Sequence, residues 1–187
     1  MIGNTIDRCL FLQQVLIPSE RLGLLMKDKA DITLVEKICK CKIDIGTDGV
    51  ISIKSANDDA YSEFIAKNIF FAFGRGFEMR IAEKLEHDDC YFELIDIARL
   101  GSEKRITQMK ARVIGDKGRT KAYIESVSGA KLAVHGDTIS FIGTATQINE
   151  AKTAVDTLLK GSTHKLAYMK MEAAHRKNKK QAQIAPF

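Results

Sequence analysis

The sequence contains little proline, little cysteine and no tryptophan. Its 187 residues include two prolines and four cysteines. Two prolines leave no proline-rich linker, and four cysteines are too few for a disulfide framework in a chain of this length. The spacing of Cys39 and Cys41 matches neither a zinc knuckle nor a redox C-x-x-C motif. We therefore expect reduced thiols, mostly in apolar surroundings.

Long apolar runs are also absent from the sequence. No stretch approaches the roughly 18 apolar residues of a membrane span, and the N-terminus lacks a basic segment followed by a long apolar run. With 45% hydrophobic residues, the chain can bury a core in one domain or in two small ones. We expect a soluble, cytoplasmic protein.

No catalytic or metal-binding constellation stands out. His87, Asp88 and Cys90 lie close in sequence, but adjacent residues of an extended segment point to opposite faces, and no second pair stands at ligand spacing. The pair Gly74 and Gly76 lacks the third glycine and the preceding strand of a nucleotide loop, and fits a helix end and a bend better. We expect no enzymatic activity, no metal and no cofactor.

Positive charge is concentrated in the second half of the chain. Residues 1–89 carry 12 Lys and Arg against 15 Asp and Glu. Residues 90–162 carry 11 against 8, and residues 163–187 carry 6 against 1. An acidic polymer is therefore expected to meet the second half of the chain and not the first.

The most informative stretch, Arg-Val-Ile-Gly-Asp-Lys-Gly-Arg-Thr-Lys, occupies residues 112–121. Two glycines, Gly115 and Gly118, bracket a two-residue tip between segments of helical periodicity. Glycine lets another backbone approach closely, and the amides that open the second helix can meet an anion. The sequence thus predicts a phosphate-binding loop. Three cations lie on or beside it: Lys117, Arg119 and Lys121.

Two kinds of phosphate-binding loop can be compared with this turn. A nucleotide-triphosphate P-loop needs G-x-x-x-x-G-K-S/T, but Val113 stands in place of the first glycine and Arg119 in place of the lysine. The G-x-x-G loop of KH domains, which clamps about four single-stranded nucleotides, fits residues 115–118. The alternative is a helical hairpin whose glycines serve packing alone.

The elements expected around the loop follow a definite order. A strand-like run occupies residues 90–97, and residues 131–135 and 138–142 alternate as strands around a two-residue turn, Gly136 and Asp137. The resulting order, β-α-α-β-β-α, strongly resembles a type I KH domain. The last helix places its apolar residues on one face: Ile148, Ala151, Val155, Leu158 and Leu159.

The first half repeats this order of elements. After a lead-in at residues 1–8, strands are expected at residues 9–17, 41–45 and 50–55, with a turn at residues 46–49. Helices are expected from Pro18 onward and through residues 32–39. A third is indicated by Tyr61, Phe64, Ile65, Ile69 and Ala72. Aligning the two halves places Lys27 where Gly115 stands and Ala30 where Gly118 stands. The first half thus lacks the loop, and because it is acidic we expect it to bind RNA weakly or not at all.

The predicted fold class is α+β, with two tandem type I KH modules and a basic helical C-terminal tail. Each module should hold a three-stranded antiparallel sheet with helices on one face. The predicted parts are a degenerate module at residues 1–76, a linker with a short helix at 77–89, a G-x-x-G module at 90–162 and the tail at 163–187. We expect the core of the second module to close by Leu159.

The tail has two alternative roles. Its helix could present cations to RNA or could be a solvated terminal helix, and Tyr168 and His175 could stack on bases or dock the tail on the domain. The additional RNA contacts predicted there are Lys165, Lys170, Arg176 and Lys177.

Further motifs narrow the resemblance. They are the Gly-Asp-Thr hairpin at residues 136–138, Phe-Ile-Gly at 141–143, Leu-Leu-Lys-Gly-Ser-Thr-His at 158–164 and Phe-Gly-Arg-Gly-Phe at 73–77. Together with the loop they make nearly the whole chain similar to archaeal members of the partner-of-Nob (Dim-two) tandem KH family.

This resemblance implies an assembly factor of the small ribosomal subunit. Such a protein binds single-stranded RNA near the 3′ end of the small-subunit rRNA and works with a Nob-like PIN-domain endonuclease that matures that end. No DNA or membrane partner is expected. The alternatives are a protein–protein adaptor and a general RNA-binding or translation-related KH protein.

We expect the loop to act by contact and not by catalysis. Its amides would meet phosphates, while Ile114 and residues 132–134 would form an apolar wall for unstacked bases. Arg112 could reach the RNA or pair with Asp116. The predicted RNA-binding residues are Arg112, Ile114, Gly115, Asp116, Lys117, Gly118, Arg119, Thr120, Lys121, Leu132, Ala133 and Val134.

Overall fold

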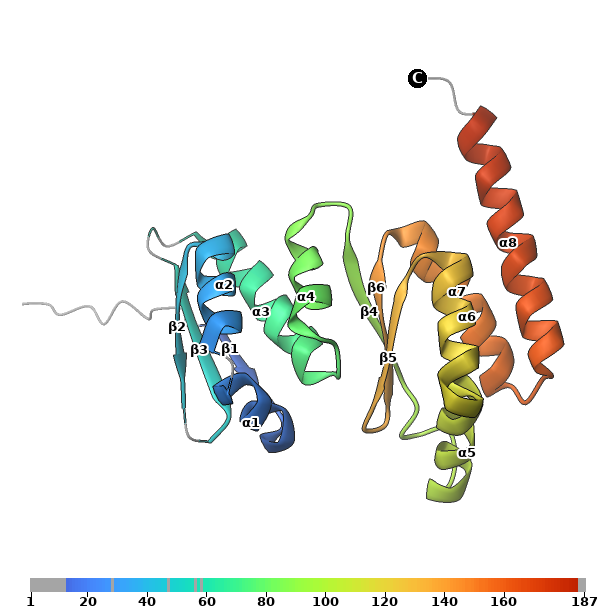
Figure 1. Ribbon diagram of the computed structural model, residues 1–187, viewed down its shortest axis with the longest axis horizontal. Coiled ribbons are helices and arrows are strands. Elements are labelled where there is room, and N and C mark those ends of the chain that lie inside the picture. Colours follow the sequence, from blue (N-terminus) through green and yellow to red (C-terminus); the bar gives the residue numbers. More distant parts are fainter. Residues whose placement is uncertain (1–12, 28, 47, 56, 58, 185–187) are drawn as a thin grey trace, which may run out of the picture. The chain divides into compact units, whose positions relative to one another are not determined.

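A computed structural model of the chain describes residues 13–27, 29–46, 48–55, 57 and 59–184. The chain divides into two compact units, residues 1–71 and 72–187, and each is described by itself (Figure 1). The segment 77–89 and the basic tail lie in the second unit. No helix in the described part of the chain is both long enough and apolar enough to cross a membrane.

The first unit has the predicted order of elements. These are β1 (Gln13–Leu16), α1 (Ser19–Lys27), α2 (Lys29–Cys39), β2 (Cys41–Ile45), β3 (Val50–Ser55) and α3 (Ala60–Gly74). The strands pair antiparallel in the order β1-β3-β2. Pro18 lies just before α1, where its missing N–H costs no helical hydrogen bond, and its carbonyl accepts the N–H of Leu22 at 3.0 Å. The expected lead-in, residues 9–12 of the expected first strand, and Thr47 of the expected turn lie outside the described residues.

The apolar residues that indicate α3 are only partly buried: Ile69 and Ala72 lie in the core, but the two aromatic residues do not. Tyr61 and Phe64 are more than half exposed, whereas Ala66 and Phe70 are fully buried. Glu63 is buried as well, and its carboxylate accepts the N–H of Ser55 at 2.8 Å. Two aromatic residues at helical spacing do not reveal which face is covered, since a polar residue with a partner can lie inside instead.

Three cysteines lie in the described part of the chain, and all three are free thiols: Cys39, Cys41 and Cys90. Burial, together with the nearby carboxylates of Glu63 and Asp59, raises the pKa of the Cys41 thiol to about 11. That thiol is therefore protonated at neutral pH. Cys9 lies outside the described residues.

The second unit repeats the element order of the first. It contains β4 (Tyr91–Asp96), α5 (Glu103–Ile114), α6 (Arg119–Ser128), β5 (Lys131–His135), β6 (Thr138–Gly143) and α7 (Ala145–Leu159), preceded by α4 (Met79–Ala82) and the 3-10 helix η1 (Glu83–Glu86). The sheet is antiparallel in the order β4-β6-β5. His135 pairs with Thr138 across the predicted turn, where Gly136 has a φ of 53°. The predicted fold class is confirmed.

The segment before β4 reaches the other face of this sheet. Glu93 accepts from Lys152 of α7 and so points to the helix side, which turns its neighbour Phe92 to the opposite side. There the ring of Phe77 packs edge-on against Phe92, with ring centroids 6.3 Å apart. As expected, α3 ends at Gly74 and the chain bends after it, where Gly76 has a φ of 99°.

The tail forms a long helix, α8 (His164–Ile184), which runs beside α7 and α6 (Figure 1). Ala167 and Met171 of α8 are fully buried in one core cluster with Ile124 and Val155. The expectation that this core closes by Leu159 is therefore wrong, because α8 supplies part of it. The prediction that the tail is helical is confirmed.

Candidate nucleic-acid interface

The predicted loop is a tight link between α5 and α6, with the 3-10 turn η2 (Asp116–Gly118) at its tip. Three of its residues have positive φ: Gly115 at 74°, Lys117 at 48° and Gly118 at 77°. The loop closes on itself through the N–H of Gly118, which donates to the carbonyl of Gly115 at 3.2 Å. This backbone, which L side chains rarely adopt, explains why the helical periodicity stops at the first glycine.

The two glycines serve different purposes. A Cβ on Gly115 would lie 2.7 Å from the Cβ of Thr120 and 2.8 Å from its backbone nitrogen, so packing requires a glycine there. A Cβ on Gly118 would meet nothing within 4 Å. Packing thus explains Gly115, whereas at position 118 the left-handed backbone, with a φ of 77°, favours glycine. A glycine that faces open space is what a loop needs when another backbone must approach it closely.

These two positions give a paired prediction. We expect Gly115→Ala to lower the free energy of unfolding by about 3 kcal/mol or more, because strain and steric overlap act together. Gly118→Ala should cost only about 1–2 kcal/mol, from the left-handed backbone alone, and should weaken binding of a ligand at the loop. Urea unfolding of both variants measures the difference. Equal losses of stability would contradict the packing of Gly115 against Thr120.

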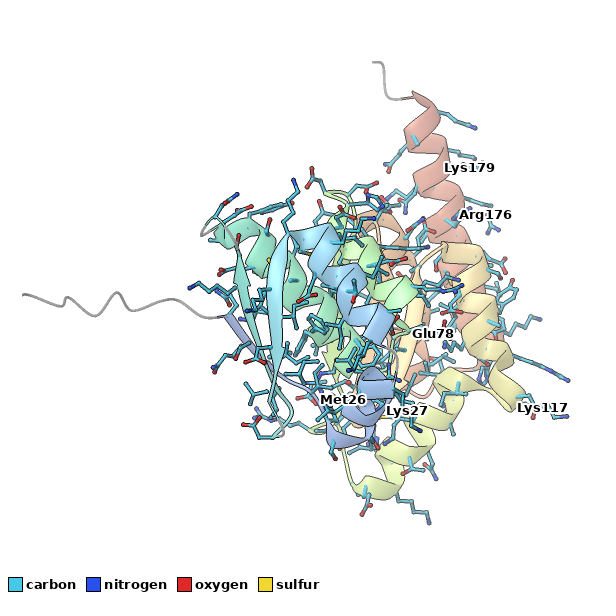
Figure 2. All side chains as sticks on the ribbon, turned by 60° about the vertical axis from the view of Figure 1, so that its left-hand side comes forward. Met26, Lys27, Glu78, Lys117, Arg176 and Lys179 are labelled. Atoms are coloured by element: carbon cyan, nitrogen blue, oxygen red, sulfur yellow. The ribbon has the colours of Figure 1, made fainter. Side chains whose placement is uncertain are left out.

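Positive charge projects from the tip of the loop. Figure 2 shows Lys117 extending away from the ribbon, and among the described residues it has no ion-pair partner. Arg119 Nη1 lies 3.8 Å from Asp116 Oδ2, and both side chains are largely exposed. A pair this long and this exposed contributes little and can yield to a stronger anion.

Arg112 is engaged elsewhere. Its guanidinium donates to the carbonyl of Ser162, and Nε2 of His164 donates to the carbonyl of Arg112 at 3.1 Å. Pairing of Arg112 with Asp116, one of the two predicted alternatives, is not observed; Asp116 pairs with Arg119 instead. Arg112 thus ties α5 to the turn between α7 and α8, and its contact with RNA stays a prediction.

Strand β5 is the edge strand beside the loop helices. The N–H of Leu132 donates to Glu125 Oε1 of α6 at 2.8 Å and so points away from β6. Because backbone groups of a strand alternate between its two edges, the N–H and carbonyl of Val134 point to the same outer edge. The strand therefore presents a short row of backbone groups at its edge, which nucleobase edges could meet.

The predicted apolar wall needs a correction. Leu132 is 2% exposed and faces the helix-side core, and Ala133 is buried as well. Thr120 is buried too, and its Oγ1 accepts from the hydroxyl of Tyr168 at 3.2 Å. The side chains of these residues are thus unavailable to a base. Apolar side-chain surface remains at Ile114, which is 37% exposed, and at the partly buried Val134.

Lys110 is a further residue of this surface that the sequence did not single out. Its Nζ lies 3.1 Å from both the Gly136 carbonyl and Asp137 Oδ1, and it precedes Ile114 by one helical turn. The bond holds the hairpin turn of β5 beside α5, as Glu125 holds the start of β5 beside α6. We call the residues 114–121, Val134 and Lys110 the loop–strand surface.

The first unit has the same framework without the loop. Three features match between the units: buried Leu25 and Val113, buried Val35 and Ile124, and the edge-strand bonds of Ile43 to Glu36 and of Leu132 to Glu125. These matches place Lys29, and not Ala30, at the position of Gly118. The predicted alignment is corrected accordingly, because Leu25 and Val35 are ten positions apart in the sequence whereas Val113 and Ile124 are eleven apart.

The two aromatic residues of α8 dock on the domain. The ring centroid of Tyr168 lies 4.4 Å from that of Tyr123, and His175 Nδ1 donates to the buried carboxylate of Glu150 at 2.7 Å. Of the two predicted roles for Tyr168 and His175, stacking on bases or docking on the domain, the structure shows docking. The four cations predicted as additional RNA contacts are all exposed: Lys165, Lys170, Arg176 and Lys177. Figure 2 shows Arg176 and Lys179 further along α8.

Metal ligands do not gather anywhere in the described residues, where no group of three or more His, Cys, Asp or Glu side chains could hold an ion.

Comparison with known proteins gives concordant matches. A family model for the second KH domain of PNO1 proteins, described as a eukaryotic type KH-domain (KH-domain type I), matches residues 91–176. The KH domain-containing protein MJ0443 of Methanocaldococcus jannaschii is 34% identical over 184 residues, which cover 96% of this chain and 81% of that protein. Residues 91–176, which the family model matches, include the first half of α8, in agreement with the position of this helix in the core.

Solved structures agree with these matches. The crystal structure of Dim2p from Pyrococcus horikoshii is similar with a TM-score of 0.78 at 35% identity, over 87% of this chain and 98% of that chain. A chain in the crystal structure of an a/eIF2alpha–aDim2p–rRNA complex from the same organism is similar with a TM-score of 0.81 at 34% identity, over 89% of this chain and 96% of that chain.

Proposed function

This chain belongs to the Dim2-like family of KH-domain proteins, and from this membership we propose that it binds single-stranded RNA near the 3′ end of the small-subunit rRNA. The observation that carries the proposal is the α5–α6 loop, in which Lys117 is unpaired by any described residue and Gly118 faces open space. A relative with 34% identity is described in a complex with rRNA, which supports the same ligand.

Phosphates would bind at the start of α6. The N–H of Arg119 already donates to the carbonyl of Asp116, so the phosphate would meet the amides that follow it in the first turn of α6. Lys117, Arg119 and Lys121 add positive charge around them. The glycine at position 118 lets the phosphate backbone approach these amides. This contact positions the strand without reading its sequence.

Bases would then lie against the remaining part of the loop–strand surface. Ile114 offers apolar area, and the N–H and carbonyl of Val134 at the edge of β5 could bond to base edges. Because Glu125 already binds the N–H of Leu132, base reading by the backbone would begin at Val134. The exposed α8 cations Lys165, Lys170, Arg176 and Lys177 would add secondary phosphate contacts.

We propose further that the chain acts in assembly of the small subunit together with a Nob-like PIN-domain endonuclease, which would mature the bound RNA end. Its own role would be to hold the RNA and not to cut it. This part of the proposal rests on the family resemblance of the sequence.

The first unit is the candidate for contact with protein partners. It lacks the loop, and its residues 1–71 carry 9 Lys and Arg against 10 Asp and Glu, so it has no excess of positive charge. Three apolar side chains of β1 and α1 are at least half exposed: Leu16, Leu24 and Met26. Exposed apolar residues of this size commonly mark interaction surfaces when they lie close together. We therefore assign protein contact, the role of an adaptor, to the first unit and RNA binding to the second.

Binding of three labelled ligands of one sequence tests the proposal. We expect single-stranded RNA to bind most tightly in fluorescence anisotropy. The same strand paired into a duplex should bind at least about tenfold more weakly, because its base edges are no longer accessible. Single-stranded DNA should fall between the two if 2′-hydroxyl groups contribute. Equal affinity for strand and duplex would contradict the proposed use of β5.

A further inference from the structure

A concave surface lies where the loop meets α8. This pocket has a volume of about 450 Å³. The residues that give it its chemistry come from three helices and the loop: Arg112, Asp116, Arg119, Thr120, His164 and Tyr168. We call it the α8 pocket. None of the contacts assigned above to the loop–strand surface uses its α8 wall.

The balance of charge in the α8 pocket favours an anion. Two guanidinium groups, of Arg112 and Arg119, face one carboxylate, of Asp116. Arg112 gives one N–H to the Ser162 carbonyl, but a guanidinium has five N–H donors in a planar fork that suits phosphate. Arg119 holds Asp116 only at 3.8 Å and is exposed. Arg119 can therefore turn toward a phosphate, and Arg112 can offer its remaining N–H groups without leaving the Ser162 carbonyl.

The α8 wall of the pocket is aromatic. The ring of Tyr168 is packed on one side by Tyr123, at 4.4 Å between centroids, and by His164, at 6.2 Å. Its hydroxyl donates to Thr120, and that of Tyr123 donates to Glu172 at 2.5 Å. The bond to Glu172 also raises the pKa of Tyr123, so this ring is uncharged at neutral pH. The hydrogen bonds hold both rings in place.

Cations beside fixed aromatic rings are the arrangement by which proteins hold single-stranded nucleic acid. The volume of about 450 Å³ lies in the range of small-ligand sites, which is about 300–1,000 Å³. One nucleotide is a ligand of matching size and chemistry, with an anionic phosphate and a flat base.

We propose that the α8 pocket holds one nucleotide of the bound strand, next to those that contact the loop–strand surface. Its phosphate meets Arg112 and Arg119, and its base packs against His164 and Tyr168. This inference rests on the proposed function, because the strand reaches the pocket over the loop that both surfaces share. The strand then contacts the loop from two sides.

The test compares RNA lengths in the full chain. A strand of about four nucleotides fills the loop–strand surface, and each further nucleotide is added at either end. For the native chain we expect the affinity to rise by about tenfold when the nucleotide that enters the pocket is added, as stacking and one phosphate contact predict.

His164→Glu is the informative variant. It places a negative charge in the pocket and removes the bond that His164 donates to the Arg112 carbonyl. An acid in the first turn of a helix suits the helix dipole, so we expect α8 to stay folded, and a thermal melt of the variant checks this. We expect the variant to lose the gain from the added nucleotide and to keep its affinity for the short strand. The matched control is His87→Glu, the same change at an exposed histidine outside the pocket, which should keep the gain.

A crosslinking experiment on the native chain makes the test independent of folding of the variant. A strand with 4-thiouridine at the added position should crosslink, after trypsin digestion, to the peptide of residues 161–165, which contains His164, or to that of residues 166–170, which contains Tyr168. Crosslinks found only in other peptides would overturn the inference.

The outcomes separate this inference from the proposed function. Equal gains in the native chain and His164→Glu would overturn the pocket assignment while short-strand binding upholds the proposed function. Loss of binding in His164→Glu combined with full binding in Lys117→Asp would support the pocket and contradict the loop–strand surface. No RNA binding by the native chain at any length would overturn both, and capture of an acidic peptide in place of RNA would assign the pocket to protein contact.

Discussion

Replacing Lys117 by aspartate is expected to lower the affinity for single-stranded RNA by about 30- to 150-fold. The change removes a charge-assisted bond and places a carboxylate beside phosphate, a loss of about 2–3 kcal/mol in binding free energy. Stability should change by no more than about 0.5 kcal/mol, since the side chain projects into solvent. Aspartate also tolerates the left-handed backbone at this position, where φ is 48°.

The first unit provides the matched control. Lys27→Asp makes the same change at the end of α1, where the loop is absent, and Lys27 is exposed like Lys117. We expect its RNA affinity to stay within about twofold of the native value, because one surface charge away from the ligand is largely screened at physiological salt. Equal losses in the two variants would show that both units bind RNA or that only net charge matters. Anisotropy titrations and thermal melts of both proteins supply the data.

Met171→Asp is expected to disrupt folding of the second unit. The side chain is fully buried in the core cluster that includes Ile124 and Val155, so aspartate would bury a charge without a partner. The expected loss is about 4 kcal/mol or more, a large part of the stability of a domain this size. The unit should melt without a cooperative transition or at a much lower temperature, as followed by circular dichroism.

Met169 is the control for this change. It lies two residues earlier on the same helix and is 55% exposed. We expect Met169→Asp to change the free energy of unfolding by no more than about 0.5 kcal/mol. If both variants melt like the native protein, α8 is a detachable tail and its place in the core is wrong.

The sequence predicts much of the fold because its local signals agree. Residues 41–45 and 50–55 alternate between more buried and less buried side chains, and they become β2 and β3 with those bounds. The loop is recognisable because two glycines interrupt helical periodicity on both sides, and the observed positive φ angles account for that interruption. Strand alternation and glycine turns are set by residues that are close together in the sequence, and the sequence alone can therefore predict them.

The docking face of α8 could not be predicted in this way. Apolar residues occur on both sides of the helix, with Leu166 and Met169 on one side and Ala167 and Met171 on the other. Only contact with α6 and α7 decides which pair is buried, and the smaller residue Ala167 lies inside where helices approach closely. The pattern of the tail alone therefore favours neither face.

Long-range polar bonds were also out of reach of the sequence. Arg112 binds the carbonyl of Ser162, and Lys110 binds Asp137. The two partners of each bond lie 50 and 27 residues apart in the sequence. The acceptor for Arg112 is moreover a backbone carbonyl, which every residue carries. The spacing of Arg112 and Asp116 suggested a local ion pair. In the structure Arg112 instead donates to the carbonyl of Ser162, in the turn between α7 and α8.

Chemical-shift mapping of backbone amides tests the central claim most directly. The full chain, labelled with nitrogen-15, is titrated with a single-stranded RNA of about four nucleotides, the length that a G-x-x-G loop clamps. The account predicts that the largest shifts fall on the amides of residues 114–121 and on Val134 at the edge of β5. Shifts confined to residues 13–71, with the loop and Val134 unchanged, would contradict it.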